Sequence, residues 1–236
     1  LSPLQPQLQQ IAALSRKKQL PALLAQLHLS AFNERFFFAF NSGQDFAKST
    51  RQIAFAYAGG ISLPDRDYYL KDDEKSRQLR EQYLAHIERM FAALGEAPAQ
   101  AAASARSVLA TETVLARATL SRVDKRDPYK TFHKLDARGL QALTPGFDWA
   151  AYRRELGLPV RLNTYNVTEP AFFKALDKRL AAMSLDELKT YLRWQLISSN
   201  APLLSNELAQ ANFDFFGQTL NGTPQLKARW KRCVEL

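Results

Sequence analysis

The sequence has a single cysteine, Cys233, and no long run of apolar residues. One cysteine cannot form an intrachain disulfide, which excludes a small disulfide-stapled scaffold without fixing the cellular compartment. We interpret Cys233 as a buried free thiol and not as a nucleophile. A transmembrane helix needs ~20 consecutive apolar residues, and no stretch approaches that length, so we predict no membrane span in this chain.

The spacing that a zinc site requires is also missing. The three histidines, His28, His86 and His133, lie far apart. An H-E-x-x-H zinc site needs two histidines one helical turn apart, with a glutamate between them that takes a proton from the bound water. His86 is followed by Glu88, but residues two apart point to different sides of a helix, so we predict a surface histidine. The sequence therefore predicts no zinc ligand and no cofactor bound by this chain.

Motifs for nucleophilic catalysis and for phosphate binding are absent as well. Residues 60–64 contain Ser62 but lack the second glycine of a nucleophile elbow. The pair Gly59-Gly60 is not followed by the Gly-Lys-Ser/Thr of a phosphate-binding loop. We predict no catalytic residue in this chain.

Two pairs of aspartates, at positions 65 and 67 and at positions 72 and 73, are candidates for acid–base chemistry. The loop that begins at Pro64 favours a structural role instead, in which the aspartates accept hydrogen bonds from backbone amides and Arg66 pairs with a carboxylate. Tyr68 and Tyr69 are then expected to pack this loop onto the core.

Charge and composition describe an ordinary globular protein. Hydrophobic residues make up 46% and charged residues 23% of the chain, and the formal net charge is +9. Lysine and arginine are scattered along the chain, as on solvated helix faces, although the excess favours polyanions or anionic surfaces as partners. A recognisable nucleic-acid module is missing, so we predict no nucleic-acid partner.

Apolar residues recur at helical spacing through most of the chain. Pro21 is expected in the first turn of a helix, and Ser184-Leu185-Asp186-Glu187 is a capping box that predicts another helix from residue 185. The predicted helices lie within residues 4–28 (one or two helices), 79–94, 108–116, around 136, around 149–152, 170–183, 185–196 and 202–216.

Two aromatic runs, residues 36–40 and 51–57, predict a strand pair. Residues 41–45, Asn-Ser-Gly-Gln-Asp, have turn chemistry and are expected to join them. Residues 160–166 are a further, isolated strand candidate. We therefore predict one mainly α-helical domain over residues 1–236, with a small β-hairpin near residues 36–57.

Six segments of the chain form an ordered series. The most specific is residues 60–70, Gly-Ile-Ser-Leu-Pro-Asp-Arg-Asp-Tyr-Tyr-Leu. The other matched segments are residues 111–116, 126–129, 188–194, 215–222 and 229–230. In the same order, these segments resemble segments of the neprilysin-like zinc metallopeptidase family, which includes neprilysin, endothelin-converting enzyme and bacterial oligopeptidases. Their residues that we interpret as structural are Pro64, Asp65, Arg66, Asp67, Tyr68, Tyr69, Arg126, Asp127, Pro128, Arg229 and Trp230.

The resemblance implies an enzyme of two mainly helical lobes around an internal cavity. One lobe carries zinc and the catalytic residues, and the other is a lid that admits only oligopeptides. This chain is similar to the lid, so the resemblance implies that the C-terminal catalytic lobe of the same protein is its partner, that zinc is bound in that lobe, and that oligopeptides are the substrates.

The chain departs from the family pattern in three ways. The family's opening segment with Asn-Gly-x-Trp is missing, the zinc-binding half is missing, and Cys233 has no cysteine partner, whereas animal members form a disulfide at the similar position. The last departure favours a bacterial-type member. The first residues show no targeting peptide, so we expect a trimmed or processed start. This start and the family resemblance together favour an extracytoplasmic location, periplasmic or secreted.

Two other hypotheses remain. A stand-alone helical module that binds peptides or a polyanion without catalysis would fit the missing zinc motif and the charge of +9. A structural fragment left by proteolysis is the second. Neither predicts catalysis by this chain.

Overall fold

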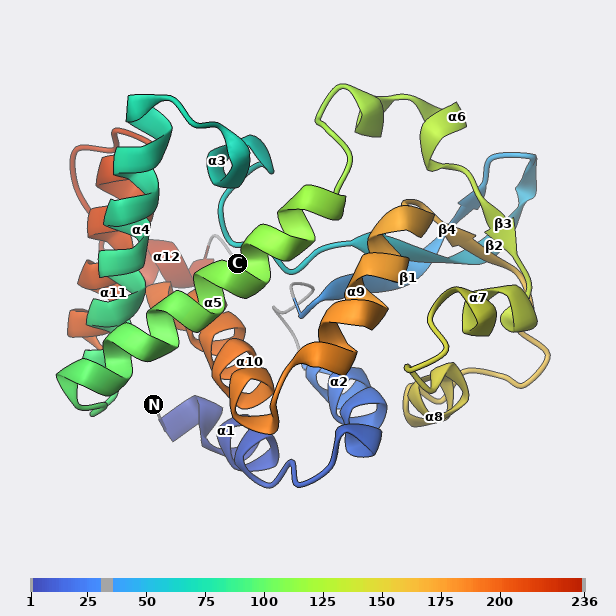
Figure 1. Cartoon of the computed structure of the whole chain (residues 1–236), viewed down its shortest axis with the longest axis horizontal. Helices are drawn as coiled ribbons and strands as arrows, with labels where there is room; N and C mark the ends of the chain where they lie inside the picture. The colour runs from blue at the N-terminus through green and yellow to red at the C-terminus, as the bar shows by residue number, and fades with distance from the viewer. Residues whose placement is uncertain (1, 31–35, 235–236) are drawn as a thin grey trace.

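The computed structural model describes residues 2–30 and 36–234. Of the predicted domain, residues 1, 31–35 and 235–236 lie outside the described residues, and the domain boundaries stay a prediction. Figure 1 shows α4, α5 and α11 at one side of the molecule, the β-strands at the other, and α2, α9 and α10 between them. The prediction of a mainly helical fold with a small β element is confirmed.

Most of the described elements are helices. The α-helices are α1 (Gln5–Ala12), α2 (Leu20–Leu29), α3 (Asp67–Leu70), α4 (Glu74–Ala93), α5 (Pro98–Ala118), α6 (Pro128–Thr131), α7 (Ala137–Leu143), α8 (Trp149–Glu155), α9 (Pro170–Ala182), α10 (Leu185–Asn200), α11 (Asn206–Asn212) and α12 (Arg229–Val234). Short 3-10 turns are η1 (Ser2–Leu4), η2 (Lys17–Gln19), η3 (Asp124–Arg126) and η4 (Ala201–Leu203), and η5 (Phe213–Leu220) is a π-helix.

The helix boundaries follow local chemistry. Pro21 lies in the first turn of α2, where its missing N–H costs nothing. The capping box is confirmed, because the Ser184 hydroxyl accepts from the Glu187 N–H and the Glu187 carboxylate accepts from the Ser184 N–H. Asp73 caps α4 by accepting from the Ser76 N–H at 2.9 Å.

The strands form one mixed sheet in the order β1-β2-β4-β3. Strand β1 (Phe38–Asp45) pairs antiparallel with β2 (Lys48–Ala58), which pairs parallel with β4 (Tyr165–Val167), and β3 (Lys134–Leu135) pairs antiparallel with β4. The predicted strand pair is confirmed. The further strand predicted at residues 160–166 is not isolated, because its last residues, 165 and 166, pair with β2 and β3 in the sheet.

The predicted turn at residues 41–45 is also wrong, because these residues continue β1. The chain reverses at Phe46 and Ala47 instead, and the Asp45 carboxylate accepts from the Ala47 N–H at 2.9 Å. Residues 41, 42 and 44 are exposed on β1, so polar side chains with turn propensity cost little there. Local turn chemistry was overridden by the pairing of the strand with β2.

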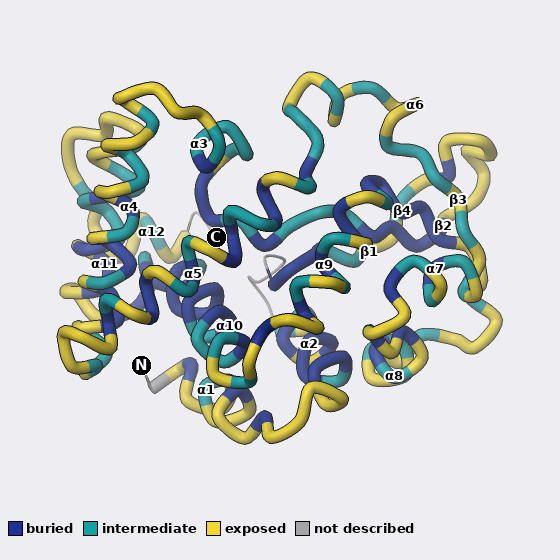
Figure 2. The backbone as a smooth tube through the Cα atoms, viewed as in Figure 1, coloured by how far each residue is buried: buried dark blue, intermediate teal, exposed yellow. Residues whose placement is uncertain are grey.

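The core lies between the helices and the sheet. Figure 2 shows buried residues in α2, α10, β4 and the second half of β2, and exposed residues along the outer side of α4 and in the connection between α1 and α2. Helix α5 contacts α4, α9 and α10, so it is the central packing element. Among the described residues, none of the helices combines the length and the apolar character that a membrane crossing requires.

Candidate functional site

A buried carboxylate, Glu112 on α5, is the focus of a polar cluster in the core. Its side chain is fully buried, which is costly for a charge unless hydrogen bonds replace the lost water. Five side-chain donors do so: Ser62 Oγ at 2.6 Å, Tyr69 Oη at 2.7 Å, Tyr83 Oη at 2.8 Å, Gln195 Nε2 at 2.9 Å and Trp194 Nε1 at 3.2 Å. We call these six residues the Glu112 cluster.

The hydrogen-bond directions in the Glu112 cluster are determined by its geometry. The Tyr69 oxygen accepts from the N–H groups of Ser62 and Leu63, at 3.1 and 2.9 Å, so its own proton is directed to Glu112. The Ser62 oxygen likewise accepts from Trp194 Nε1 at 3.1 Å and donates to Glu112. Every partner therefore donates, which suits an ionised, acceptor-only carboxylate.

Burial shifts the acidity of this cluster. Burial raises the pKa of Glu112, and the hydrogen bonds from Ser62, Tyr69, Tyr83 and Trp194 act in the opposite direction. Burial and then the nearby Glu112 charge raise the pKa of Tyr69 and of Tyr83 well above that of a free tyrosine. Tyr69 and Tyr83 therefore remain protonated and donate to Glu112.

The Glu112 cluster joins three of the matched segments. Tyr69 belongs to residues 60–70, Glu112 to residues 111–116 and Trp194 to residues 188–194. Tyr191 adds a further link, because its hydroxyl donates to the Gly60 carbonyl at 2.9 Å. Segments that are far apart in sequence are thus held by one set of buried polar contacts.

Gly60 is required by this arrangement. Its φ is +75°, and a Cβ at this position would lie 2.5 Å from the Tyr191 hydroxyl oxygen and 2.8 Å from the Phe37 Cα. A side chain would therefore suffer both backbone strain and a clash with backbone. Only glycine lets strand β2 lead directly into the loop that begins at Pro64.

The loop at residues 64–68 makes the backbone contacts that the sequence predicts. The Asp65 carboxylate accepts from the Asp67 N–H at 2.8 Å and lies 3.4 Å from Arg122 Nε. Tyr69 is buried and Tyr68 packs partly buried against the core. The expected pairing of Arg66 with a carboxylate is not what the structure shows, because Arg66 Nη1 donates to the Thr119 carbonyl at the end of α5.

The predicted residues of the segment 126–129 lie apart from the Glu112 cluster. Asp127 caps α6 by accepting from the Tyr129 N–H at 2.9 Å, and Pro128 occupies the first turn of that helix. Arg126 is exposed, and Tyr129 is 91% exposed. These residues therefore shape a surface turn.

At the far end, Arg229 binds the main chain. Its guanidinium donates to the carbonyls of Leu203 and Leu204 at 2.7 and 2.8 Å, directly after α10. Trp230 is 66% exposed. Cys233 is exposed, so the interpretation of a buried thiol is wrong: the short helix α12 lies on the surface and buries none of its residues.

A cavity of about 410 Å³ lies where two matched segments meet. Residues 60–70 contribute Ser62 and Pro64, and the segment 215–222 contributes Phe216, Leu220 and Asn221. The other lining residues are Ser198, Ser199, Pro202 and Asn212. Because its lining residues carry hydroxyl and amide groups and no charge, this cavity is suited to a neutral polar group.

One wall of this cavity is the π-helix η5, which continues α11 without a break. A Cβ on Gly217 would lie 2.3 Å from the Phe213 ring, so the wide turn depends on glycine. The Thr219 hydroxyl donates to the Asp214 carbonyl five residues earlier, at 2.8 Å. Single π turns occur often at functional sites, and the sequence predicted an ordinary helix here.

The histidines do not come together. His28 Nδ1 lies 2.7 Å from the Tyr152 hydroxyl, and His86 stacks on Phe215 with ring centres 5.1 Å apart. His86 is 5% exposed, so the prediction of a surface histidine is wrong: π-helix aromatics cover the ring. Burial lowers the pKa of each of these two histidines to about 4.

Within residues 2–30 and 36–234, no group of three or more His, Cys, Asp or Glu side chains is placed to hold a metal ion. The donor set for zinc therefore does not fit the described part of this chain, and we assign no zinc ligand to it.

Glu112, Tyr83 and Gln195 are the residues that sequence reasoning missed. A signal for Glu112 is present, since it is an acidic residue between the core-facing Val108 and Leu115 of an otherwise apolar helix. A charge on the buried face of a helix needs partners, but the sequence does not say which residues supply them.

Comparisons with known proteins agree with the matched segments. The N-terminal model of the family described as "Peptidase family M13" matches residues 1–236. Endothelin-converting enzyme 1 of Cavia porcellus is 27% identical over 84% of this chain and 27% of its own length. Membrane metallo-endopeptidase-like 1 of Mus musculus is 26% identical over 92% of this chain and 30% of its own length.

Solved structures share the fold. Mycobacterium tuberculosis zinc metalloprotease Zmp1 in complex with an inhibitor superposes with a TM-score of 0.92 and 31% identity, over 99% of this chain and 35% of that one. PepO of Lactobacillus rhamnosis has a TM-score of 0.75 at 18% identity, over 99% of this chain and 36% of that one, which shows the fold alone. The chain thus spans about a quarter to a third of the length of these relatives.

Proposed function

The chain belongs to peptidase family M13, and from this membership we propose that it is the non-catalytic N-terminal portion of a zinc metalloendopeptidase that cleaves oligopeptides. The observation that carries the proposal is the family match over residues 1–236 combined with a described region that contains no group of metal ligands. Zinc and the catalytic residues would be supplied by a C-terminal lobe of the same protein, and the likeness to the zinc metalloprotease Zmp1 supports this.

We further propose that this portion acts as the lid that limits substrate size. A lid has to keep its shape while peptides enter, and the Glu112 cluster supports this because it ties α4, α5 and α10 to α3 and to the loop after β2 through buried hydrogen bonds. The cavity at the matched segments, which has no charged lining, is consistent with a positioning role without chemistry.

The test compares two polypeptides from the same reading frame. The 236-residue chain is expected to cleave no peptide with or without added zinc, whereas the longer product with an H-E-x-x-H motif cleaves a short oligopeptide and loses this activity with a chelator. A reading frame that ends at Leu236, with no second chain carrying that motif, would overturn the peptidase proposal. An intact-mass spectrum decides first whether a species larger than 26.7 kDa is present.

The lid role has its own test in the longer product. We expect it to cleave a short oligopeptide and to leave a long unfolded protein intact. The variant Glu112→Ala, which loosens the proposed lid, is expected to increase cleavage of the long substrate relative to the short one. An unchanged ratio in a variant whose N-terminal portion is measurably destabilised would contradict the lid role and leave the peptidase proposal standing.

A stand-alone binding module is the second candidate, and the net charge of +9 is the observation that favours it. It predicts binding of peptides or a polyanion that chelators do not affect. Absence of any binding in a titration of the 236-residue chain with heparin and with mixed oligopeptides would count against it.

We also propose a bacterial-type protein that works outside the cytoplasm. Cys233 is the single cysteine of the sequence, and two of the structural relatives come from Mycobacterium and Lactobacillus. Cell fractionation of the source organism tests the location, and recovery of the protein in the cytoplasmic fraction alone would refute it.

A further inference from the structure

A second cavity, of about 550 Å³, lies between α1, the α4–α5 connection and α10. Its volume is within the range of roughly 300–1,000 Å³ that is typical of small-ligand sites. It shares no lining residue with the cavity at the matched segments. We call it the α1–α10 cavity.

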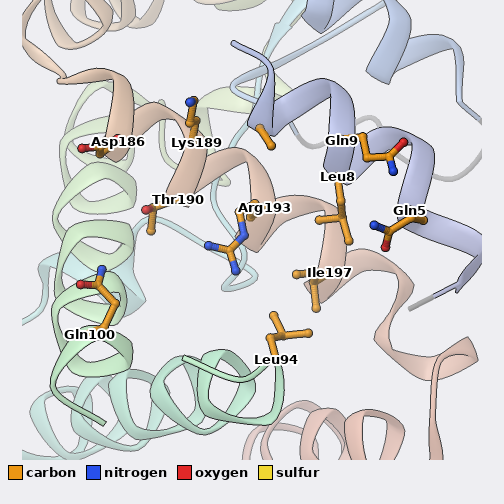
Figure 3. A pocket seen from close by; sticks show the side chains of 11 residues that line it. Gln5, Leu8, Gln9, Leu94, Gln100, Asp186, Lys189, Thr190, Arg193 and Ile197 are labelled. Carbon is orange, nitrogen blue, oxygen red and sulfur yellow. The ribbon is translucent and has the colours of Figure 1, made fainter. Parts of the chain in front are cut away.

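The α1–α10 cavity has an apolar end and a polar end. In Figure 3, Leu8, Leu94 and Ile197 gather on one side of Arg193, and Asp186 lies on the other. The Arg193 guanidinium points into the space between them. A ligand that fits this lining therefore carries an apolar group next to an acceptor for arginine.

Arg193 is held in place before any ligand arrives. Its Nη1 donates to Glu96 Oε1 at 2.8 Å, and Ser104 Oγ donates to Glu96 Oε2 at 2.8 Å. The guanidinium carbon also lies 5.5 Å from the centre of the Phe91 ring. Holding the side chain in this way lowers the entropy lost on binding a ligand.

The guanidinium still has donors to offer. Glu96 occupies one of the five N–H groups that arginine carries, and no other hydrogen-bond partner of Arg193 occurs among the described residues. Lys189, one turn earlier on α10, adds a second positive charge to the lining. Arginine binds carboxylates through two parallel hydrogen bonds, which suits a terminal carboxylate.

We propose that the α1–α10 cavity binds the C-terminal residue of an oligopeptide whose last side chain is apolar. Arg193 bonds the terminal carboxylate, and Leu8, Leu94 and Ile197 contact the last side chain. The choice of a peptide as ligand rests on the proposed function, whereas the site itself uses only residues of this chain and no zinc. The cavity would retain peptides by their C-terminal end, away from the chemistry.

The experiment titrates the 236-residue chain in the presence of a chelator with acetyl-Ala-Ala-Leu. Binding is followed by calorimetry and by amide chemical shifts. The carboxamide analogue is expected to bind about tenfold more weakly, because it loses the charge-assisted pair with Arg193. Acetyl-Ala-Ala-Ser is expected to bind roughly fivefold more weakly, because its side chain gains little from the apolar end. Equal binding of the acid and the amide, or no binding of any of the three peptides, overturns the proposal.

Matched variants locate the site. Arg193→Gln is expected to weaken binding of the leucine peptide about tenfold and to remove the preference for the acid over the amide. The control Arg89→Gln removes another arginine–carboxylate pair, with Asp214 at 2.8 Å outside the cavity, and is expected to leave binding unchanged. Equal losses in the two variants, or unchanged binding by Arg193→Gln, would refute the assignment.

A further variant keeps the test decisive if Arg193→Gln unfolds. Lys189 makes no ion pair with another described residue, so Lys189→Gln is expected to fold normally and to weaken binding of the acid roughly two- to threefold without affecting the amide. An equal effect on both peptides would contradict the proposal. Zinc-dependent cleavage by the longer product is a separate readout, so failure of this site and failure of the proposed function are distinguishable.

Discussion

The matched segments 60–70 and 126–129 contain the same residue types, aspartate, arginine and tyrosine, but they differ in burial. Tyr69 is 4% exposed and donates to the buried Glu112, whereas Tyr129 is 91% exposed and contributes only its backbone N–H to a helix cap. Hydrogen bonds in the low-dielectric core are strong and costly to break, whereas those at the surface compete with water. The comparison teaches that a family resemblance in sequence does not tell which segment stabilises the fold.

The largest expected effect comes from removing the carboxylate at the centre of the buried region. Glu112→Ala leaves the hydroxyls of Ser62, Tyr69 and Tyr83 without their acceptor and opens a cavity, so we expect a loss of about 3–5 kcal/mol in the free energy of unfolding. Glu112→Gln keeps the shape and one acceptor oxygen and is expected to cost about half as much. Urea unfolding measures both, and a loss below about 1 kcal/mol for Glu112→Ala would show that the Glu112 cluster is not stabilising.

The second-largest loss of stability is expected at Gly60, and Gly95, another glycine with positive φ, serves as the comparison. Gly60→Ala introduces a Cβ against Tyr191 and Phe37 and is expected to cost about 3 kcal/mol. Gly95 has φ +91°, and a Cβ at this position would meet nothing within 4 Å, so Gly95→Ala is expected to cost only about 1 kcal/mol. Equal losses of stability in thermal unfolding would mean that backbone strain, and not packing in the buried region, determines the cost of both substitutions.

The third effect is a loss of stability in mild acid. The pKa of His86 is lowered to about 4 by burial, whereas an unfolded histidine titrates near 6.5. Between these values the unfolded state binds more protons, so stability is fully present above pH 6.5 and falls as the pH drops toward 4. For His86 alone we expect a loss of about 2 kcal/mol between pH 7.5 and pH 5, and His28, with the same shift, contributes similarly.

The variant His86→Phe separates these contributions. It should weaken the dependence of stability on pH above pH 5 by about half and leave the part due to His28. Carboxylates whose pKa is lowered by hydrogen bonds, such as Asp73 and Asp124, lose their contribution at lower pH, below their unfolded values near 4. An unchanged pH profile in His86→Phe would refute the role of this histidine.

The smallest effect is expected in the exposed segment. Asp127→Ala removes the cap of α6 and is expected to cost about 1 kcal/mol or less. Arg126→Ala is expected to change stability by less than about 0.5 kcal/mol, because its side chain is exposed. A cost for either variant that approaches that of Glu112→Ala would remove the distinction between the two regions.

The helices and the strand pair could be predicted from the sequence because their signals are local. The apolar spacing of α4, the capping box of α10 and the aromatic runs of β1 and β2 lie within short windows. Sequence reasoning misplaced the hairpin turn and the burial of His86, because strand pairing and covering aromatics come from other parts of the chain. It also missed the π-helix, whose wide turns depend on the close approach of Gly217 and Phe213.

The sequence by itself determined the fold class, the order of the matched segments and the likeness to one family, because these depend on periodicity and on short motifs. Only the tertiary structure decided what the motifs do. The donors to Glu112 come from positions between 62 and 195 and meet around one carboxylate, and Arg193 faces a cavity completed by α1. The free-energy cost of burying a charge depends on all of its hydrogen-bond partners together, and these partners become neighbours only when the chain has folded.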